Sequence, residues 1–192
     1  AGPGLLSHVL IQKYCNHLPF YRQSEMFDRE GIDISRSTMS SWAGKSAKLL
    51  ELLAAEIKKY ILNSTHIHTD DTTIKVLAPG TGKTKTGRLW TYVKDGRPHG
   101  EKEAPAVYYS YSPDRKGIRP EEHLKNYQGI LHADAYSGYD RLYPNKDSPD
   151  SRIFEAACWA HTRRKFYEVT VANNNAVIAT AALGRMSDIY KI

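Results

Sequence analysis

The fold is decided around residues 66–72, which read His-Ile-His-Thr-Asp-Asp-Thr. Side chains of a strand alternate between its two faces, so His66, His68 and Asp70 share one face and Asp71 lies on the other. An acid inside such a run is unusual, because strands disfavour aspartate and protein interiors exclude unpaired charge. The stretch therefore predicts a strand in which an acid has a specific role.

A second aspartate follows a second short strand. Residues 131–139 read Leu-His-Ala-Asp-Ala-Tyr-Ser-Gly-Tyr, which places Asp134 at the C-terminal end of an apolar run. Two close carboxylates repel each other unless a cation holds them, and paired Mg²⁺ ions suit oxygen ligands and in-line displacement at phosphorus. In the structural alternative, Asp70 or Asp71 only ends a strand and Asp134 only caps a helix. The order of the surrounding elements has to decide between a metal site and this structural alternative.

That order is of a mixed α/β (α+β) type. Strand-like runs span residues 66–76, 89–93, 106–111, 130–133 and 153–157. Turn-forming segments over 79–87 and 95–98 separate the first three runs and permit an antiparallel meander. A helix that starts near Arg119 precedes the fourth run, and the chain is again helical from His161 onward. Three meander strands, a helix and a strand that ends in an acid form an RNase H-like order.

The part before the strands predicts a separate unit. Residues 1–64 read as a small all-helical unit, and residues 65–192 as the RNase H-like domain. Pro19 suits the start of a helix over 20–28, and Gly31 suits its C-terminal cap. A short helix over 35–42 and a longer helix after Lys45 would complete a helix-turn-helix outline.

Composition limits the class of protein. The chain has 192 residues, 27 of them basic and 21 acidic, and a formal net charge of +6. No segment approaches the ~20 apolar residues of a membrane span, and no secretory signal is visible. Two cysteines, Cys15 and Cys158, form no disulfide framework, which favours a cytoplasmic location. The basic excess permits a polyanionic partner.

Basic residues gather in three places. They are Lys83, Lys85 and Arg88 near one hairpin end, Arg115 and Lys116 after the third strand, and Arg163 and Arg164 in the last helical region. Each group is either a solvated face or a set of contacts to nucleic-acid phosphates. The glycine-rich segment 79–84 fails as a phosphate-binding P-loop, because Leu77 stands where that motif needs glycine.

Several motifs together resemble the transposases of the insertion sequence 66 family over nearly the whole chain. They lie at residues 21–25, 77–80, 82–93, 111–117, 134–136 and 158–161. The resemblance implies a catalytic domain in which an Asp-Asp-Glu triad binds Mg²⁺, or alternatively Mn²⁺, to cleave and join double-stranded DNA at transposon ends and target. It makes Asp70 the first metal ligand and Asp134 the second. It also implies a homo-oligomer assembled on DNA and a bacterial, nucleoid-associated location.

The resemblance also covers His161, and it breaks at the third acid. Cys158 and His161 are similar to a Cys-x-x-His signature of several such transposases, so His161 is a further catalytic candidate. The family's third carboxylate lies in an Asp-Asn-Asn-x-x-Glu-Arg stretch, but residues 173–179 read Asn-Asn-Asn-Ala-Val-Ile-Ala. We therefore expect the third acid beyond residue 192 and little or no strand cleavage by these 192 residues.

Two other functions compete with this interpretation. His66, His68 and Asp70 match the start of the His-x-His-x-Asp-His motif of dinuclear zinc hydrolases, but Asp71 replaces its last histidine. A measurement of the zinc content of the protein would distinguish a zinc hydrolase from a transposase. The second alternative is a DNA-binding or assembly module without activity, which would use the helical unit and the basic hairpin alone.

Overall fold

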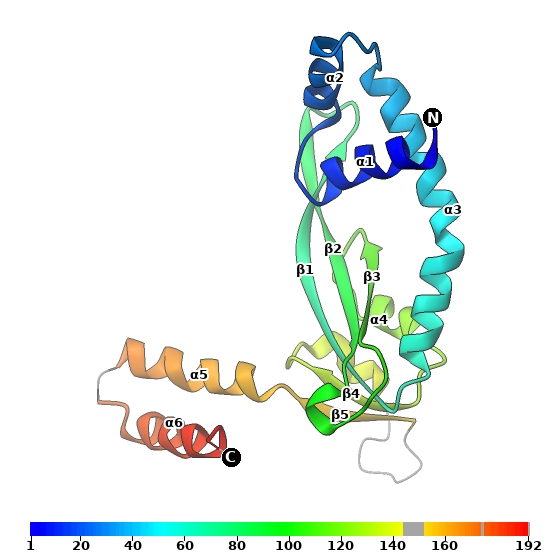
Figure 1. Ribbon diagram of the computed structural model, residues 1–192. Coiled ribbons are helices and arrows are strands. Elements are labelled where there is room, and N and C mark those ends of the chain that lie inside the picture. The colour runs from blue at the N-terminus through cyan, green and yellow to red at the C-terminus, as the bar shows by residue number, and fades with distance from the viewer. Residues whose placement is uncertain (144–151, 174, 192) are drawn as a thin grey trace. The chain divides into compact units, whose positions relative to one another are not determined.

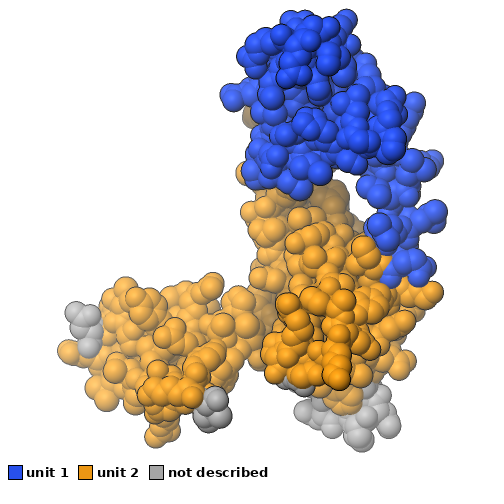
Figure 2. All heavy atoms as spheres, in the orientation of Figure 1, with its two compact units in different colours: residues 1–56 blue, residues 57–192 orange. Residues whose placement is uncertain are grey.

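The computed structural model describes residues 1–143, 152–173 and 175–191. By their internal contacts, these residues form two compact units, Ala1–Glu56 and Ile57–Ile192, which are coloured separately in Figure 2. This division falls inside a long helix. The domain boundary near residue 64 stays a prediction.

The first unit is helical. It contains α1 (Pro3–Tyr14), α2 (Phe20–Arg29) and the first part of α3 (Arg36–Leu62). Gly31 has the left-handed φ of +77° at the end of α2, and the Ile32 N–H bonds back to the Phe27 carbonyl at 2.8 Å. The predicted glycine cap is therefore confirmed.

The prediction of two helices over residues 35–62 is wrong. The chain forms the single helix α3, which starts after Ser35, whose Oγ accepts the Thr38 N–H at 3.2 Å. Gly44 lies inside this helix. A lone glycine costs a helix only about 1 kcal/mol relative to alanine, whereas a proline would end it. The helix-turn-helix outline thus reduces to α2, a glycine turn and one long helix.

The second unit is built on one five-stranded sheet (Figure 1). Its strands are β1 (His66–Ala78), β2 (Lys83–Lys94), β3 (Ala106–Ser112), β4 (Gly129–Ala133) and β5 (Ile153–Ala157), in the order β3-β2-β1-β4-β5. The first three pair antiparallel, while β4 pairs parallel with β1 and β5 parallel with β4. The mixed α/β class and its RNase H-like strand order are confirmed.

Short helices connect the strands of this sheet. The 3-10 helix η1 (Arg97–His99) follows β2, α4 (Ile118–His123) precedes β4, and the 3-10 helix η2 (Ser137–Leu142) follows β4. The connection between β1 and β2 is shorter than the predicted loop 79–87. Gly80 and Gly82 adopt φ of +80° and +63°, which permits a tight turn, so Lys83 and Lys85 belong to β2.

The core lies against one face of the sheet. Ile67, Trp90 and Leu131 are fully buried there, and Leu124 and Tyr139 cover them from the segments that flank β4. On the opposite face, large side chains remain 40–54% exposed, namely Val107, Tyr109, Tyr111, Ile130 and Phe154. The strands therefore have a buried and an exposed face, as an alternating pattern requires.

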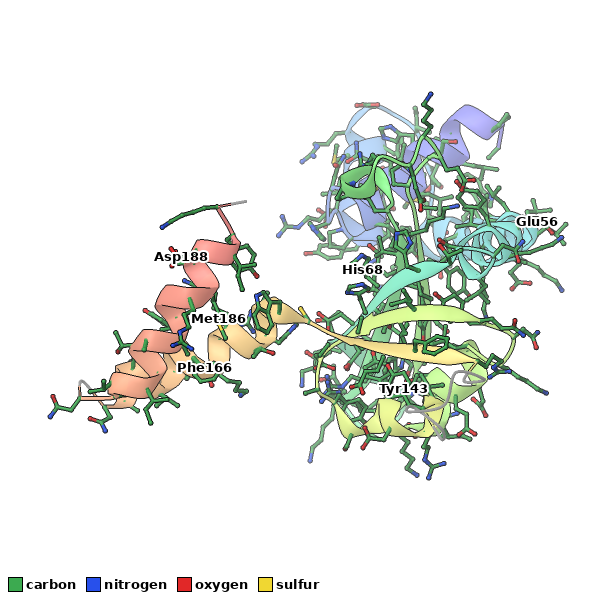
Figure 3. The ribbon with its side chains drawn as sticks, turned by 90° about the horizontal axis from the view of Figure 1, so that it is seen from below. Glu56, His68, Tyr143, Phe166, Met186 and Asp188 are labelled. Atoms are coloured by element: carbon green, nitrogen blue, oxygen red, sulfur yellow. The ribbon has the colours of Figure 1, made fainter. Side chains whose placement is uncertain are left out.

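Two helices follow the last strand. They are α5 (Trp159–Ala172) and α6 (Val177–Ile189), which contact each other and carry Phe166 and Met186 respectively (Figure 3). Among the described residues, none of the helices is both long and apolar enough to span a membrane.

Candidate active site

Of the two predicted acids, Asp70 lies on β1 and Asp134 directly follows β4, which pairs parallel with β1. The paired residues are His66 with Ile130, Ile67 with Leu131 and His68 with His132, and the rings of His68 and His132 lie 4.6 Å apart. The pairing ends there, two residues before Asp70 on β1 and Asp134 after β4, so the juxtaposition of the two aspartates stays a prediction. Asp70 is exposed on the same sheet face as His68, which Figure 3 labels on β1. The separation of the two carboxylates stays a prediction.

Asp71 lies on the opposite, buried face of β1, as the alternation predicts. Its side chain is only 1% exposed. Arg88 donates a hydrogen bond from Nη1 to Asp71 Oδ2 at 2.8 Å, and Arg115 donates from Nε to Asp71 Oδ1 at 2.8 Å. A buried carboxylate needs such partners, because an unpaired charge in the interior is very costly.

Arg115 also connects Asp71 to Asp134. Its Nη2 lies 3.6 Å from Asp134 Oδ2, and its guanidinium lies over the Tyr136 ring, 3.9 Å from the ring centroid. The Tyr136 N–H donates to Asp134 Oδ1 at 3.1 Å, so the backbone after β4 fixes the other carboxylate oxygen. Sequence reasoning missed this pairing. The sequence offered one indication of it: Asp71 falls on the core-facing side of its strand, where a buried carboxylate requires a cationic partner.

The charges of the same three aspartates act on the buried phenol of Tyr139. Burial raises the pKa of Tyr139, and the negative charges of Asp134, Asp71 and Asp70 raise it further. The hydrogen bond with Thr69 opposes this increase. All three aspartates therefore lie near enough to Tyr139 to influence its ionisation.

His161 shares a pocket with Asp134. The pocket measures about 550 Å³ and is lined by Arg115, Asp134, Tyr136, His161 and Lys165, among others. The Cys158 N–H donates to the Ala133 carbonyl at 2.9 Å, which anchors the start of α5 at the end of β4. Within the described residues, the buried Nδ1 of His161 has no hydrogen-bond partner. His161 and the predicted ligand Asp134 therefore line the same pocket.

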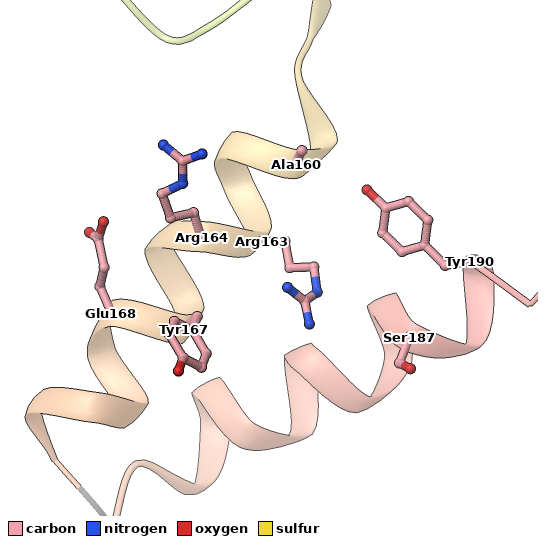
Figure 4. A pocket seen from close by; sticks show the side chains of 7 residues that line it. All are labelled: Ala160, Arg163, Arg164, Tyr167, Glu168, Ser187 and Tyr190. Carbon is pink, nitrogen blue, oxygen red and sulfur yellow. The ribbon is translucent and has the colours of Figure 1, made fainter.

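The predicted DNA-binding residues lie on separate elements of the second unit, and their contact with DNA stays a prediction. Arg163 and Arg164 line a different pocket, and Figure 4 shows Arg163 pointing from α5 toward α6. Lys83 and Lys85 are exposed near the tip of the β1–β2 hairpin. Ala78, which pairs with Lys83, is eight residues beyond Asp70, or about 27 Å along the strand.

The remaining basic residues lie closer to the acids. Arg88 and Arg115 are both paired with Asp71 and are 27% and 35% exposed. Lys116 follows Arg115 and is exposed. The charge of the two arginines is thus largely balanced inside the protein, while Lys83, Lys85 and Lys116 keep theirs at the surface.

The described residues fit only part of a Mg²⁺ ligand set. Among them, no group of three histidine, cysteine or acidic side chains is arranged to hold a metal ion. Asp70 and Asp134 carry the oxygen donors that Mg²⁺ prefers, and their role as metal ligands stays a prediction. The same finding applies to the zinc alternative: His66, His68 and Asp70 share a strand face without forming such a group.

The fold and the acids together define the class of the protein: an RNase H-like domain with Asp70 on β1 and Asp134 directly after β4. The model of the family described as "Transposase IS66 family" matches residues 1–192, and the chain belongs to this family.

Curated relatives show a similar match. "Uncharacterized protein y4qI" of Sinorhizobium fredii (strain NBRC 101917 / NGR234) is 37% identical over 191 residues, which cover 96% of this chain and 35% of that protein. "Uncharacterized protein y4hP" of the same organism is 37% identical over 202 residues, which cover 100% of this chain and 36% of that protein. The chain thus spans about a third of the length of these relatives.

One solved structure is also similar. It is the simian T-cell lymphotropic virus intasome in complex with PP2A regulatory subunit B56 gamma, at 13% sequence identity and a TM-score of 0.31. The match covers 59% of this chain and 46% of that one.

Proposed function

We propose that this chain is part of the catalytic domain of a DNA transposase that cleaves and joins DNA strands with Mg²⁺. The observation that supports the proposal is the parallel pairing of β1 with β4 up to His68 and His132, since Asp70 and Asp134 each follow two residues later. Membership of the transposase family supports the reaction class. The substrate is double-stranded DNA, at the transposon ends and at the target, inside the bacterial cytoplasm.

Asp70 and Asp134 are the proposed metal ligands. Asp70 is exposed, and the Asp134 carboxylate is 22% exposed and lines a pocket, so both can reach a cation from solvent. Two Mg²⁺ ions in such a site supply charge stabilisation for an in-line displacement at phosphorus. His161, which lines the same pocket as Asp134, is proposed as a further catalytic residue. The third carboxylate is expected in the family's Asp-Asn-Asn-x-x-Glu-Arg stretch.

A nicking assay tests the proposal. A full-length chain should cleave labelled transposon-end DNA with Mg²⁺ or Mn²⁺, whereas these 192 residues alone should show little or no cleavage. Asp70→Asn or Asp134→Asn in the full-length chain should abolish cleavage and leave DNA binding intact. Robust cleavage by the 192 residues would mean that a local acid, such as Glu155 or Glu168, completes the site.

DNA binding without catalysis is the second candidate function. The exposed Lys83 and Lys85 on the hairpin and the net charge of +6 favour it. Specific DNA binding by a full-length chain that never cleaves, with either metal ion, would support this alternative. Both candidate functions expect a homo-oligomer assembled on DNA. The mass of the protein–DNA complex would give the number of protein chains in it.

A further inference from the structure

An ion-pair cluster joins β1 and β2 to the segments that follow β3 and β4. We call it the Asp71 cluster, and its members are Asp71, Arg88, Arg115 and Asp134. Asp71 is the buried centre, and each arginine lies 2.8 Å from one of its oxygens. Asp134 is held only at the edge, 3.6 Å from Arg115 Nη2. Arg115 is therefore the one member that touches both carboxylates.

The backbone around Arg115 is closely fitted to the segment after Asp134. Gly117 approaches Gly138 so closely that a Cβ at Gly117 would lie 2.7 Å from the Gly138 carbonyl oxygen. The Tyr136 hydroxyl donates a hydrogen bond to the Arg115 carbonyl, and the Tyr136 ring lies against the Arg115 guanidinium. Main chain and side chain together thus bring Arg115 to the end of β4.

The charges of the Asp71 cluster balance. Two carboxylates face two guanidinium groups, and the more buried acid receives the two shorter contacts. Asp71 therefore fixes the direction in which Arg115 points, because a planar guanidinium that binds one carboxylate through Nε and Nη2 has little freedom left. A lysine would keep the charge at this position but could not contact both acids in this fixed geometry.

We propose that Arg115 is a positioning residue that holds the Asp134 carboxylate for the reaction, with Asp71 as its anchor. The inference rests on the proposed function, since it concerns a proposed metal ligand. It differs from the expectation that Arg115 contacts DNA phosphates. In a phosphate contact, Arg115 would contribute to DNA affinity, whereas a positioning residue contributes to the rate of the chemical step.

The first test is independent of metal and DNA. Amide hydrogen exchange on the 192-residue chain should show that the Tyr136 N–H, which is bonded to Asp134 Oδ1, exchanges faster in Arg115→Gln, by up to about tenfold. Asp71→Asn should have the same effect, although Asp71 does not touch Tyr136 in the described contacts. The Tyr139 N–H, which is bonded to the Tyr136 carbonyl, serves as the internal reference.

The second test separates rate from affinity in the full-length chain. Arg115→Gln should lower the single-turnover cleavage rate about 100-fold and leave the Kd for transposon-end DNA within about twofold, because a small displacement of a catalytic group costs rate rather than binding. Arg115→Lys should recover part of the rate. Arg141→Gln, which removes a partner of an exposed ion pair with Glu121, is the matched control and should change neither quantity.

The outcomes distinguish the two proposals. A wild-type chain that never cleaves contradicts the proposed function, and the exchange data still test the position of Asp134. A cleaving wild type combined with weaker DNA binding and an unchanged rate in Arg115→Gln would overturn the inference. In that case Asp71→Asn should release Arg115 and tighten DNA binding. Should Asp71→Asn fail to fold, as thermal unfolding would show, Arg115→Lys and Arg115→Gln carry the test.

Discussion

At the scale of single residues, Asp70 and Asp71 are adjacent in the chain but differ in environment. Asp70 is exposed, whereas the Asp71 side chain is 1% exposed and paired with Arg88 and Arg115. One acid is thus available to a ligand, and the other contributes to the structure. The same alternation along β1 that separates the two faces separates these two roles.

We predict that Asp71→Asn lowers the free energy of unfolding by about 2–4 kcal/mol, because it leaves two arginines without their buried partner. The loss stays below that of a fully buried pair, since Arg88 and Arg115 are 27% and 35% exposed. Asp70→Asn is the matched control and should change stability by no more than about 0.5 kcal/mol. Urea unfolding of both variants measures the difference in their free energies of unfolding. Equal losses in the two variants would contradict the structural role assigned to Asp71.

His123 predicts a pH dependence of stability. Its Nδ1 pairs with the Tyr92 hydroxyl at 2.8 Å and its Nε2 with the Ser110 hydroxyl at 3.0 Å. Burial, helped by the charge of Lys58, lowers the pKa of His123 to about 4. The unfolded chain has a histidine pKa near 6.5, so between these values the unfolded state binds more protons.

The resulting stability should be fully present above about pH 6.5 and lost as the pH falls toward 4. Because the imidazole is only half-buried, we expect about 1–2 kcal/mol from this residue after allowance for solvent screening. Urea unfolding between pH 4.5 and 7 should therefore show a weaker pH dependence for His123→Gln than for the wild type. Identical slopes would show that His123 titrates normally in the folded protein.

At the scale of elements, the parallel pairing of β4 with β1 depends on one glycine. Gly129 starts β4 with φ of +143°, and a Cβ there would lie 2.3 Å from the Thr65 carbonyl oxygen. Only glycine tolerates both the backbone conformation and this close approach. The end of α3, the start of β1 and the start of β4 can meet there because this position has no side chain.

We predict that Gly129→Ala destabilises the protein by about 2–3 kcal/mol, through backbone strain and the displacement of β4. Gly184→Ala is the control, since Gly184 lies within α6 and an added Cβ would have nothing within 4 Å. That change should be neutral or stabilise α6 by up to about 1 kcal/mol. Thermal unfolding of the two variants gives the comparison, and a tolerated alanine at 129 would contradict the role of this contact.

At the scale of the whole molecule, the excess positive charge is distributed unevenly. Arg88 and Arg115 are balanced by Asp71 and Asp134, whereas Lys83 and Lys85 lie exposed on the hairpin. The formal net charge of +6 therefore does not show which side chains can attract DNA. The two arginines near the acids contribute little to that attraction, and the exposed lysines contribute more.

We predict that the 192-residue chain binds duplex DNA with an affinity that falls steeply with salt. Replacing Lys83 and Lys85 together by glutamine should weaken binding about equally for all sequences and reduce the slope of log K against log salt by about 2. Fluorescence anisotropy over a salt series measures this slope, with Arg141→Gln as the control. A slope unchanged by the double substitution would mean that the hairpin is only solvated.

The sequence by itself determined the element order, the five strands, the alternation along β1 and the family resemblance. These follow from local patterns, because strand periodicity, turn residues and ordered motifs are written in neighbouring residues. It was wrong about the break in α3 and the length of the hairpin loop, because α3 continues through Gly44 and the positive φ of Gly80 and Gly82 permits a tight turn. The expected ligands Asp70 and Asp134 remain predictions.

Only the tertiary structure decided how the charged residues pair. Asp71, Arg88, Arg115 and Asp134 lie on separate segments, and nothing in their spacing predicts that they meet. The pairing follows from the register of β1 against β2 and β4 and from the close approach of Gly117 to Gly138. Long-range contacts depend on how the chain folds back on itself, so Arg115, predicted from sequence as a DNA contact, is found bound to two acids.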